Sequence, residues 1–473
     1  MTAPFTLRPY QEAAVESLRQ AYRSARLAPL LVLPTGGGKT QCFSFIARET
    51  AGRGKSVLIL AHRRELVRQA SRKLHEAGVR HGIIAPGFSR TRDPVQVASV
   101  QTLGRRLGTL PEFALIIIDE AHHAVAGQWD KVIKAQPRAR LLGVTATPER
   151  SDGRGLGVQS GGCFDCIVTG PSVADLTAQG HLSPARVYAP AEAPDLSGIR
   201  TKGGDFDAGQ LEARINVSTI TGDVLAHWRR HALGLPTIAF CISVQHAQDV
   251  AATFRAAGVR AVCGHGGLPD GERDAAINGL GTGAVEVLAT CDLVSEGLDV
   301  PAVGAVILLR PTKSLGLYLQ QVGRGLRPAP GKARLIVLDH AGCTVIHGLP
   351  DAPREWSLAG RPKGVKAPAT WQCPSCFAVQ KPAPACVACG HVVPVPEDKP
   401  GEGRSILQAD GELQEVDPAR VAHLRAAPLH SLVSQARTDA DLREIARARG
   451  YKAGWVWKIQ QERRQRALPE VAA

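Results

Sequence analysis

The amino-acid sequence predicts an α/β protein with two parallel-sheet domains in tandem, followed by a small cysteine-rich module and a helical segment. Its 473 residues are about three times the ~150 residues of an average domain. Apolar runs of strand length alternate with helix-period stretches, which is typical of parallel strands joined by helical crossovers. This alternation stops near residue 150 and restarts near residue 237, so two such domains are expected.

The individual elements follow from these runs. In the first domain we expect strands in LLVL, VLIL, VQVASV, ALIII and LLGVT, with helices in TQCFSFIARE and ELVRQASRKLHEAG. In the second we expect strands in TIAFC, RAVC, VEVLA, VGAVILL and RLIVL, with helices through Phe254, in ERDAAINGL and around Tyr318. The expected boundaries are 1–185 and 210–345 for the two domains, 346–370 and 393–415 for Pro- and Gly-rich linkers, 371–392 for the cysteine module and 416–468 for a basic helical tail.

Composition narrows the class of protein. Lys and Arg number 57 against 43 Asp and Glu, a formal net charge of +14, which favours a polyanionic partner. Apolar runs fall short of the ~18 to 20 residues that span a bilayer, so we expect no membrane segment. The first residues lack the pattern of a secretory signal, and the 11 cysteines are an odd number scattered along the chain. We therefore expect a protein of the reducing cytoplasm.

The sharpest local pattern is LLVLPTGGGKTQ, an apolar strand, a glycine-rich turn and the start of a helix. Backbone amides of such a turn and the helix N-terminus favour phosphate, so we expect a ligand that carries phosphates. Lys39 would reach the terminal phosphates, and the Thr40 hydroxyl would bind Mg²⁺. Leu33 stands where the eight-residue phosphate-loop pattern has its first glycine, so the pattern is a variant. The expected nucleotide-binding residues here are Thr35, Gly36, Gly37, Gly38, Lys39 and Thr40.

A second pattern, ALIIIDEAHH, ends a buried strand with two carboxylates. Asp119 would hold Mg²⁺, and Glu120 would position the attacking water, because phosphoryl transfer depends mainly on placement and charge neutralisation. A strand ending in Asp-Glu is common by itself. Its combination with the upstream loop predicts a catalytic site.

Over residues 6–345 these motifs resemble the superfamily 2 helicases and translocases, in particular the DEAH-type members near the XPB-like and type III restriction branch. The resemblance implies two RecA-like domains that bind ATP between them. LRPYQ resembles the adenine-recognition element, with Arg8 and Gln11. LAHRRELVRQ and SVQTLG resemble segments that grip one nucleic-acid strand. GVTATP resembles the coupling motif, and His122 would couple the nucleotide and nucleic-acid sites.

The resemblance continues in the second domain. LATCDLVSEGLDVP is similar to a motif in which Gly297 and Asp299 approach the nucleotide and Thr290 faces the nucleic acid. LYLQQVGRGLRP resembles the final motif, which assigns catalytic roles to Gln320, Arg324 and Arg327. An arginine that a second domain delivers to the γ-phosphate accelerates hydrolysis strongly, so domain closure would be coupled to the reaction.

The cysteines of WQCPSCFAVQKPAPACVACGH form two C-x2-C pairs, Cys373 with Cys376 and Cys386 with Cys389. Such pairs can present four thiolates tetrahedrally to Zn²⁺, so we expect a structural zinc ribbon; redox-active or free thiols are the alternatives. His391 is expected to be a bystander. The spacing of Cys163 and Cys166 is similar, but with no second pair nearby we expect an ordinary strand.

The tail, with aromatic residues at 451, 455 and 457, carries nine basic against four acidic residues between 437 and 466. It could contact phosphates and stack on bases, or form an amphipathic cap with buried aromatics; both readings stand. The resemblance implies an ATP-dependent DNA helicase or translocase. A protein partner at the zinc ribbon or the tail is a further hypothesis. The alternatives are an RNA-dependent helicase and a non-catalytic nucleic-acid-binding scaffold.

Overall fold

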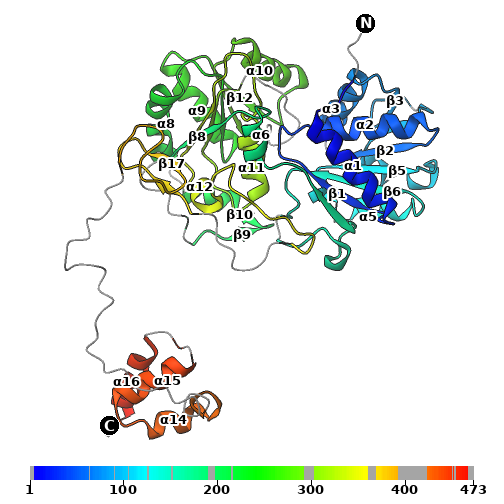
Figure 1. Cartoon of the computed structure of the whole chain (residues 1–473). Helices are drawn as coiled ribbons and strands as arrows, with labels where there is room; N and C mark the ends of the chain where they lie inside the picture. The colour runs from blue at the N-terminus through cyan, green and yellow to red at the C-terminus, as the bar shows by residue number, and fades with distance from the viewer. Residues whose placement is uncertain are drawn as a thin grey trace, which may run out of the picture. The chain divides into compact units, whose positions relative to one another are not determined.

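The computed structural model divides the chain into two compact units, Met1–Val395 and Pro396–Ala473. The first unit contains two α/β lobes, and the second is helical (Figure 1). The structure describes residues 5–62, 64–89, 91–104, 106–124, 127–150, 153–189, 196, 198–214, 217–291, 303–360, 369–392, 423–449, 451 and 454–466.

The first lobe is built on a parallel sheet of seven strands in the order β3-β4-β2-β5-β6-β1-β7. Its strands are β1 (Pro29–Val32), β2 (Val57–Ala61), β3 (His81–Ile84), β4 (Val95–Ser99), β5 (Leu115–Asp119), β6 (Arg140–Thr145) and β7 (Cys166–Thr169). Its helices are α1 (Pro9–Arg23), α2 (Lys39–Gly52), α3 (Arg64–Glu76), α4 (Val100–Leu103), α5 (Gln128–Lys134) and α6 (Val173–Ala178), with 3-10 turns η1 (Leu107–Thr109), η2 (Ala121–His123) and η3 (Val158–Ser160).

The central strands of this sheet are buried on both faces. In β5, Ile117 belongs to one apolar cluster, while Ile116 and Ile118 belong to the cluster on the opposite face. A parallel sheet that carries helices on both sides needs apolar residues at successive positions, because alternate side chains point to opposite faces. The uninterrupted run LIIID is therefore a buried strand, as the sequence predicts.

The second lobe has an eight-stranded sheet in the order β12-β13-β11-β14-β15-β8-β17-β16. Its strands are β8 (Ala185–Tyr188), β11 (Thr237–Phe240), β12 (Ala261–His265), β13 (Val287–Cys291), β14 (Ala305–Leu308), β15 (Leu335–Asp339), β16 (Trp371–Gln372) and β17 (Ala378–Gln380), beside a small hairpin of β9 (Thr201–Lys202) and β10 (Asp205–Phe206). Its helices are α7 (Ala208–Arg214), α8 (Val217–His231), α9 (Val244–Ala256), α10 (Asp270–Thr282), α11 (Leu315–Gly323) and α12 (Cys343–His347).

The cysteine-rich module is an extension of the second sheet. Its strand β17 pairs antiparallel with β8, and β16 pairs antiparallel with β17. The strand β8 would otherwise be an open edge, and pairing satisfies the backbone groups of such an edge. The module is thus joined to the second lobe by a sheet, although a Pro- and Gly-rich segment separates the two in sequence.

The segment of residues 348–360, which the sequence analysis includes in a linker, returns to the first lobe. Leu358 is buried in a cluster of that lobe, and its carbonyl accepts a hydrogen bond of 2.9 Å from the Gly157 amide. Arg354 stiffens the segment, because its guanidinium donates to the carbonyls of His347, Leu349, Pro350 and Ala352. We name residues 348–360 the return segment.

The second unit contains α14 (Leu429–Gln435), α15 (Asp439–Arg449) and α16 (Gly454–Arg466) around its own small apolar cluster. Trp455 packs against this cluster, whereas Trp457 is 64% exposed. Arg449 and Arg463 donate to carbonyls at helix ends within the unit. Across the described part of the chain, the helices are too short or too polar to span a bilayer.

Candidate active site and metal centre

The glycine-rich loop follows β1 and ends where α2 begins, at Lys39. Gly36 and Gly38 have φ of 85° and 82°, a conformation that favours glycine because it has no Cβ. The left-handed Gly38 is the N-cap of α2. The loop therefore turns sharply into a helix N-terminus, where unpaired amides and the helix dipole favour an anion.

The start of the chain closes one side of this loop. The Tyr10 hydroxyl donates to the Gly37 carbonyl at 3.0 Å, and the Gln11 amide lies 3.4 Å from the same oxygen. Gln11 is buried, its side-chain carbonyl accepts from the Arg8 amide at 2.9 Å, and a Cβ on Gly38 would overlap its amide nitrogen. Arg8 and Gln11 are thus brought to the loop, with Tyr10 as a partner that the sequence analysis did not single out.

Asp119 ends β5 and Glu120 begins the next turn. Glu120 has φ of 48° and ψ of 56°, a left-handed conformation that costs a non-glycine residue energy and is frequent at functional sites. The Asp119 carboxylate accepts from the Glu120 amide at 3.0 Å. One Glu120 carboxylate oxygen is buried without a hydrogen bond and lies 3.4 Å from the His122 ring.

A polar chain leads from Glu120 to the second lobe. The ring of His122 is 3.1 Å from the Thr145 hydroxyl, which in turn donates to the Thr147 carbonyl at 2.9 Å. A Cβ on Gly316, in α11, would lie 2.9 Å from the Thr147 hydroxyl oxygen. The polar chain therefore ends at a contact between the lobes.

These groups surround a pocket of about 610 Å³ that both lobes line. The first lobe contributes the loop, both carboxylates and Arg8 with Gln11; the second contributes Arg324 and Arg327. In parallel α/β sheets, ligands bind in the crevice just outside the carboxyl ends of the strands, where the loops after neighbouring strands diverge. Gln320 is buried in α11 and does not line the pocket. Gly297 and Asp299 lie outside the described residues, and Thr290 is buried in β13.

One face of α3 also lines the pocket, which the sequence analysis missed. Its residues are Leu66, Gln69, Lys73 and Glu76, and Lys73 pairs with Glu76 at 2.8 Å. Their spacing of three, four and three residues places them on one face of a helix. No local pattern distinguishes this face from the others of the helix, and LAHRRELVRQ, which contains Leu66 and Gln69, is expected from the resemblance to contact nucleic acid.

The four cysteines of the module lie together. The Sγ atoms of Cys373 and Cys389 are 3.7 Å apart, as are those of Cys376 and Cys386, and all four lie within 4.8 Å of one another. Thiolates bound at about 2.3 Å to a tetrahedral Zn²⁺ lie about 3.8 Å apart, so the set is compatible with zinc. Within the described residues these four form the one cluster of metal-ligand type, and it includes neither His391 nor Cys163 and Cys166.

Comparison with known proteins agrees with this geometry. Residues 4–150 match the family of the type III restriction enzyme, res subunit, and residues 220–329 match the helicase conserved C-terminal domain. A Lactococcus phage protein named only by its mass of 51.5 kDa is 32% identical over 434 residues, 88% of this chain and 87% of that protein. IRC3 of Saccharomyces cerevisiae, named as an ATP-dependent helicase, is 31% identical over 73% of this chain.

The chain spans only 53% of the yeast relative's length. A solved structure of the Type ISP restriction-modification enzyme LlaBIII bound to DNA has the same fold over 71% of this chain and 28% of that one, with a TM-score of 0.52 and 18% identity. Fold, site and relatives define an enzyme of the ATPase and helicase class. The chain belongs to the superfamily 2 helicases, in the XPB-like and type III restriction branch.

Proposed function

We propose that the protein is an ATP-dependent DNA helicase or translocase that hydrolyses ATP in the pocket between its two lobes. The observation that carries this proposal is the composition of the pocket wall. Lys39, Asp119 and Glu120 line it from the first lobe, and Arg324 and Arg327 line it from the second. A site divided in this way forms only when the lobes are together, so hydrolysis depends on their arrangement.

Each group has a role that its chemistry suits. Lys39 binds the terminal phosphates, Thr40 and Asp119 hold Mg²⁺, and Glu120 orients the attacking water. The Glu120 oxygen that accepts no hydrogen bond, and the glycine loop at Gly36 and Gly38, fit a bound nucleotide with its ion. When bound, Mg²⁺ neutralises phosphate charge as it develops in the transition state.

The second lobe supplies the remaining charge. A Cβ on Gly36 would lie 3.5 Å from Cγ of Arg327, so this arginine reaches the loop that holds the phosphates. Arg324 is 7% exposed. Its charge would interact more strongly with phosphate there than at the surface, because the effective dielectric constant is lower. The polar chain from Glu120 through His122 and Thr145 to Thr147 would transmit to α11 whether the nucleotide has been hydrolysed.

We propose that the polyanion is DNA. The solved relative with a TM-score of 0.52 is bound to DNA, and the motif resemblance is to the repair and restriction branch. The net charge of +14 suits any nucleic acid, because binding releases condensed counterions. The segments at residues 60–69 and 99–104 are proposed to contact the nucleic-acid backbone, which carries no sequence information.

We also propose that the four cysteine thiolates hold a structural Zn²⁺. A zinc ion with four protein ligands has no open position, so it stabilises the fold and performs no chemistry. Here it would fix the hairpin of β16 and β17 on the edge strand β8. Loss of the ion would therefore lower the stability of the second lobe.

The test is steady-state ATP hydrolysis by the purified full chain with no nucleic acid, duplex DNA, single-stranded DNA and RNA, at low and moderate salt. We expect stimulation by DNA that weakens as salt rises. Stimulation by RNA alone would make the protein an RNA-dependent helicase. Absence of hydrolysis under every condition would leave a non-catalytic scaffold and contradict the proposal.

A further inference from the structure

A second large cavity lies far from the strand ends that hold the nucleotide pocket. It is a groove of about 1020 Å³ between the C-terminal halves of α1 and α2, at the amino ends of β5 and β6. The nucleotide pocket lies at the carboxyl ends of the same sheet. The groove's apolar lining consists of Val15, Leu18, Phe45, Ile46, Ala114 and Leu115; of these, Phe45, Ile46 and Ala114 are partly exposed.

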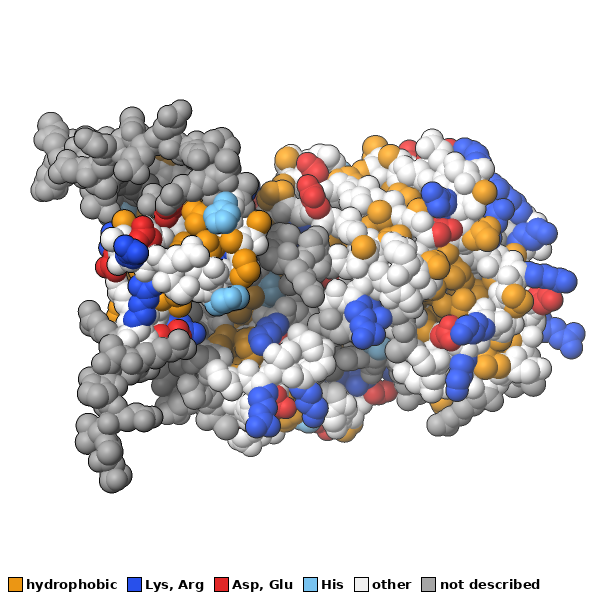
Figure 2. Space-filling view, turned by 90° about the horizontal axis from the view of Figure 1, so that it is seen from below, with side chains coloured by type: hydrophobic (Ala, Val, Ile, Leu, Met, Phe, Trp, Pro, Cys, Tyr) orange, Lys and Arg blue, Asp and Glu red, His pale blue; other side chains and the backbone are white. Residues whose placement is uncertain are grey.

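The rim of the groove is strongly basic. Glu49 is the carboxylate in the lining, and Glu16 and Glu112 stand beside it as partners of rim arginines. Six cations therefore face three carboxylates. The half of the molecule that contains the first lobe shows hydrophobic side chains bordered by Lys and Arg when seen from below (Figure 2). The basic residues of the rim are Arg19, Arg23, Arg53, Lys55, Arg138 and Arg140.

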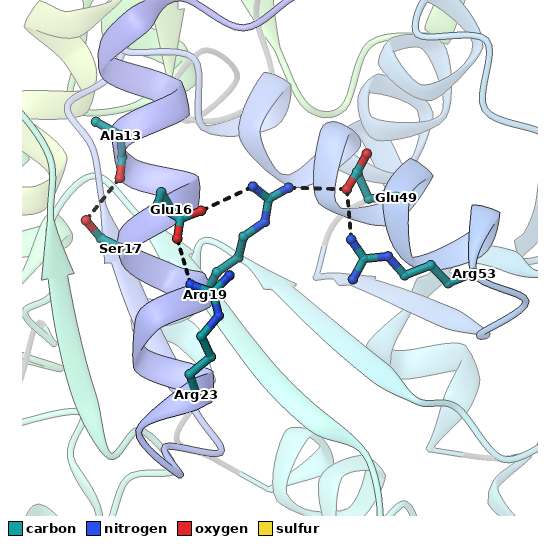
Figure 3. A network of polar contacts seen from close by, with 7 residues as sticks. All are labelled: Ala13, Glu16, Ser17, Arg19, Arg23, Glu49 and Arg53. Carbon is teal, nitrogen blue, oxygen red and sulfur yellow. Dashed lines mark hydrogen bonds and ion pairs between the residues drawn. The ribbon is translucent and has the colours of Figure 1, made fainter.

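Ion pairs hold part of this rim in place. Arg19 of α1 contacts Glu16 at 3.3 Å on its own helix and Glu49 at 3.2 Å on α2, and Arg53 contacts the same Glu49 oxygen at 3.3 Å (Figure 3). Arg23 contacts Glu16 at 2.8 Å. The arginines are thus pre-oriented, which reduces the entropy lost when they bind a further anion.

The arginines still have capacity for more anions. The side chains of Arg23, Arg53 and Arg138 are 67%, 73% and 85% exposed. A guanidinium has five N–H donors, and a single ion pair uses few of them. Two further lining residues are also held in place, since the Tyr22 hydroxyl donates to the Leu141 carbonyl at 2.7 Å and the Arg140 guanidinium lies 5.4 Å from the centre of the Tyr22 ring.

We propose that this groove docks an acidic amphipathic segment of a partner protein. Its apolar side chains would cover the floor between α1 and α2, and its carboxylates would meet the rim arginines, as in helix-in-groove recognition. A nucleic-acid backbone fits less well. Its phosphates would pair with the rim arginines as carboxylates do, but they would leave the apolar floor uncovered.

The probe for this proposal is a synthetic fluorescent peptide of about 14 residues, with leucines at helical spacing and glutamates elsewhere. A control peptide has the same composition in scrambled order. Fluorescence anisotropy with the full chain should give tighter binding of the amphipathic peptide, weakening as salt rises. Arg23→Glu and Arg53→Glu should each raise its Kd roughly tenfold. Arg92→Glu, an exposed reversal outside the groove in the same lobe, should leave the Kd unchanged.

DNA-stimulated ATP hydrolysis by the two groove variants should match the unsubstituted protein, because the groove is remote from the nucleotide pocket. Ile46→Gln, which makes the floor polar, should weaken the peptide as the rim variants do. Equal binding of the scrambled peptide, or an equal loss with Arg92→Glu, would overturn the proposal. So would a loss of DNA stimulation in Arg23→Glu, which would make the groove a nucleic-acid surface. Tighter binding of a peptide copied from the chain's own acidic stretch SILQADGELQEVD would assign the groove to the chain itself and overturn an external partner.

Discussion

The backbone of Gly323 lies so close to Thr35 that a Cβ on this glycine would overlap the threonine side chain. Gly323 ends α11 in the second lobe, and Thr35 belongs to the glycine-rich loop of the first. At the proposed phosphate site, the backbone of the second lobe therefore packs directly against a side chain of the first lobe. Arg324 and Arg327, which come shortly after Gly323 in the sequence, line the pocket.

Gly323→Ala should reduce ATP hydrolysis by at least about tenfold, because the added methyl separates the two lobes and a small misplacement of catalytic groups is costly. The rate with saturating DNA is the measurement. Gly271→Ala in α10 is the matched control, since nothing lies within 4 Å of its Cβ position. Equal rates for the two variants would contradict the role of this contact.

Glu120→Gln should lower the hydrolysis rate by about a hundredfold or more while nucleotide binding persists, because the amide keeps the shape but loses the charge that orients water. Hydrolysis and the binding of a fluorescent ATP analogue should be measured together. Glu112→Gln is the control; its side chain is 80% exposed and lies outside the pocket. A fully active Glu120→Gln enzyme would remove Glu120 from the proposed mechanism.

Cys376→Ser should abolish stoichiometric zinc and lower the melting temperature, because the module pairs with β8 of the second sheet. Metal analysis of the purified protein and thermal melting are the measurements, and a chelator should have the same effect on the unsubstituted chain. Cys163→Ser should leave the zinc content unchanged. Retention of zinc in Cys376→Ser would contradict the four-thiolate site.

Gly155→Ala should destabilise the chain by about 1 to 3 kcal/mol, because a Cβ there would overlap the Leu358 carbonyl of the return segment. The midpoint of urea unfolding, followed by intrinsic fluorescence, measures the change. Gly108→Ala, where nothing lies within 4 Å, should have a much smaller effect. If both variants unfold at the same urea concentration, the return segment does not stabilise the first lobe.

Acidification should destabilise the second lobe through His340. Burial, followed by repulsion from His227, lowers the pKa of His340 from 6.5 to about 3. Between these pH values the unfolded chain binds a proton that the folded chain excludes, so stability falls as the pH drops below 6.5. From this one group we expect about 2 kcal/mol less stability at pH 5 than at pH 8. Urea unfolding at both pH values should show a smaller difference in His340→Gln.

The strands, the glycine-rich loop and the Asp-Glu pair could be read from the sequence because each depends on neighbouring residues. An apolar run such as LIIID is a buried strand wherever it folds, and a Gly-Gly-Gly-Lys-Thr turn brings its own amides to a phosphate. The same applies to the two C-x2-C pairs. Their spacing predicts that each pair can form a knuckle, and all four Sγ atoms lie within 4.8 Å of one another.

Contacts between residues far apart in the chain were decided only by the tertiary structure. The face of α3 that lines the pocket, the pairing of β17 with β8 and the return of Leu358 to the first lobe all depend on which surfaces meet after folding. The groove between α1 and α2 likewise gathers cations from residues 19 to 140. Local patterns set what each segment becomes, but packing selects its neighbours, because burial of apolar surface depends on area and not on sequence distance.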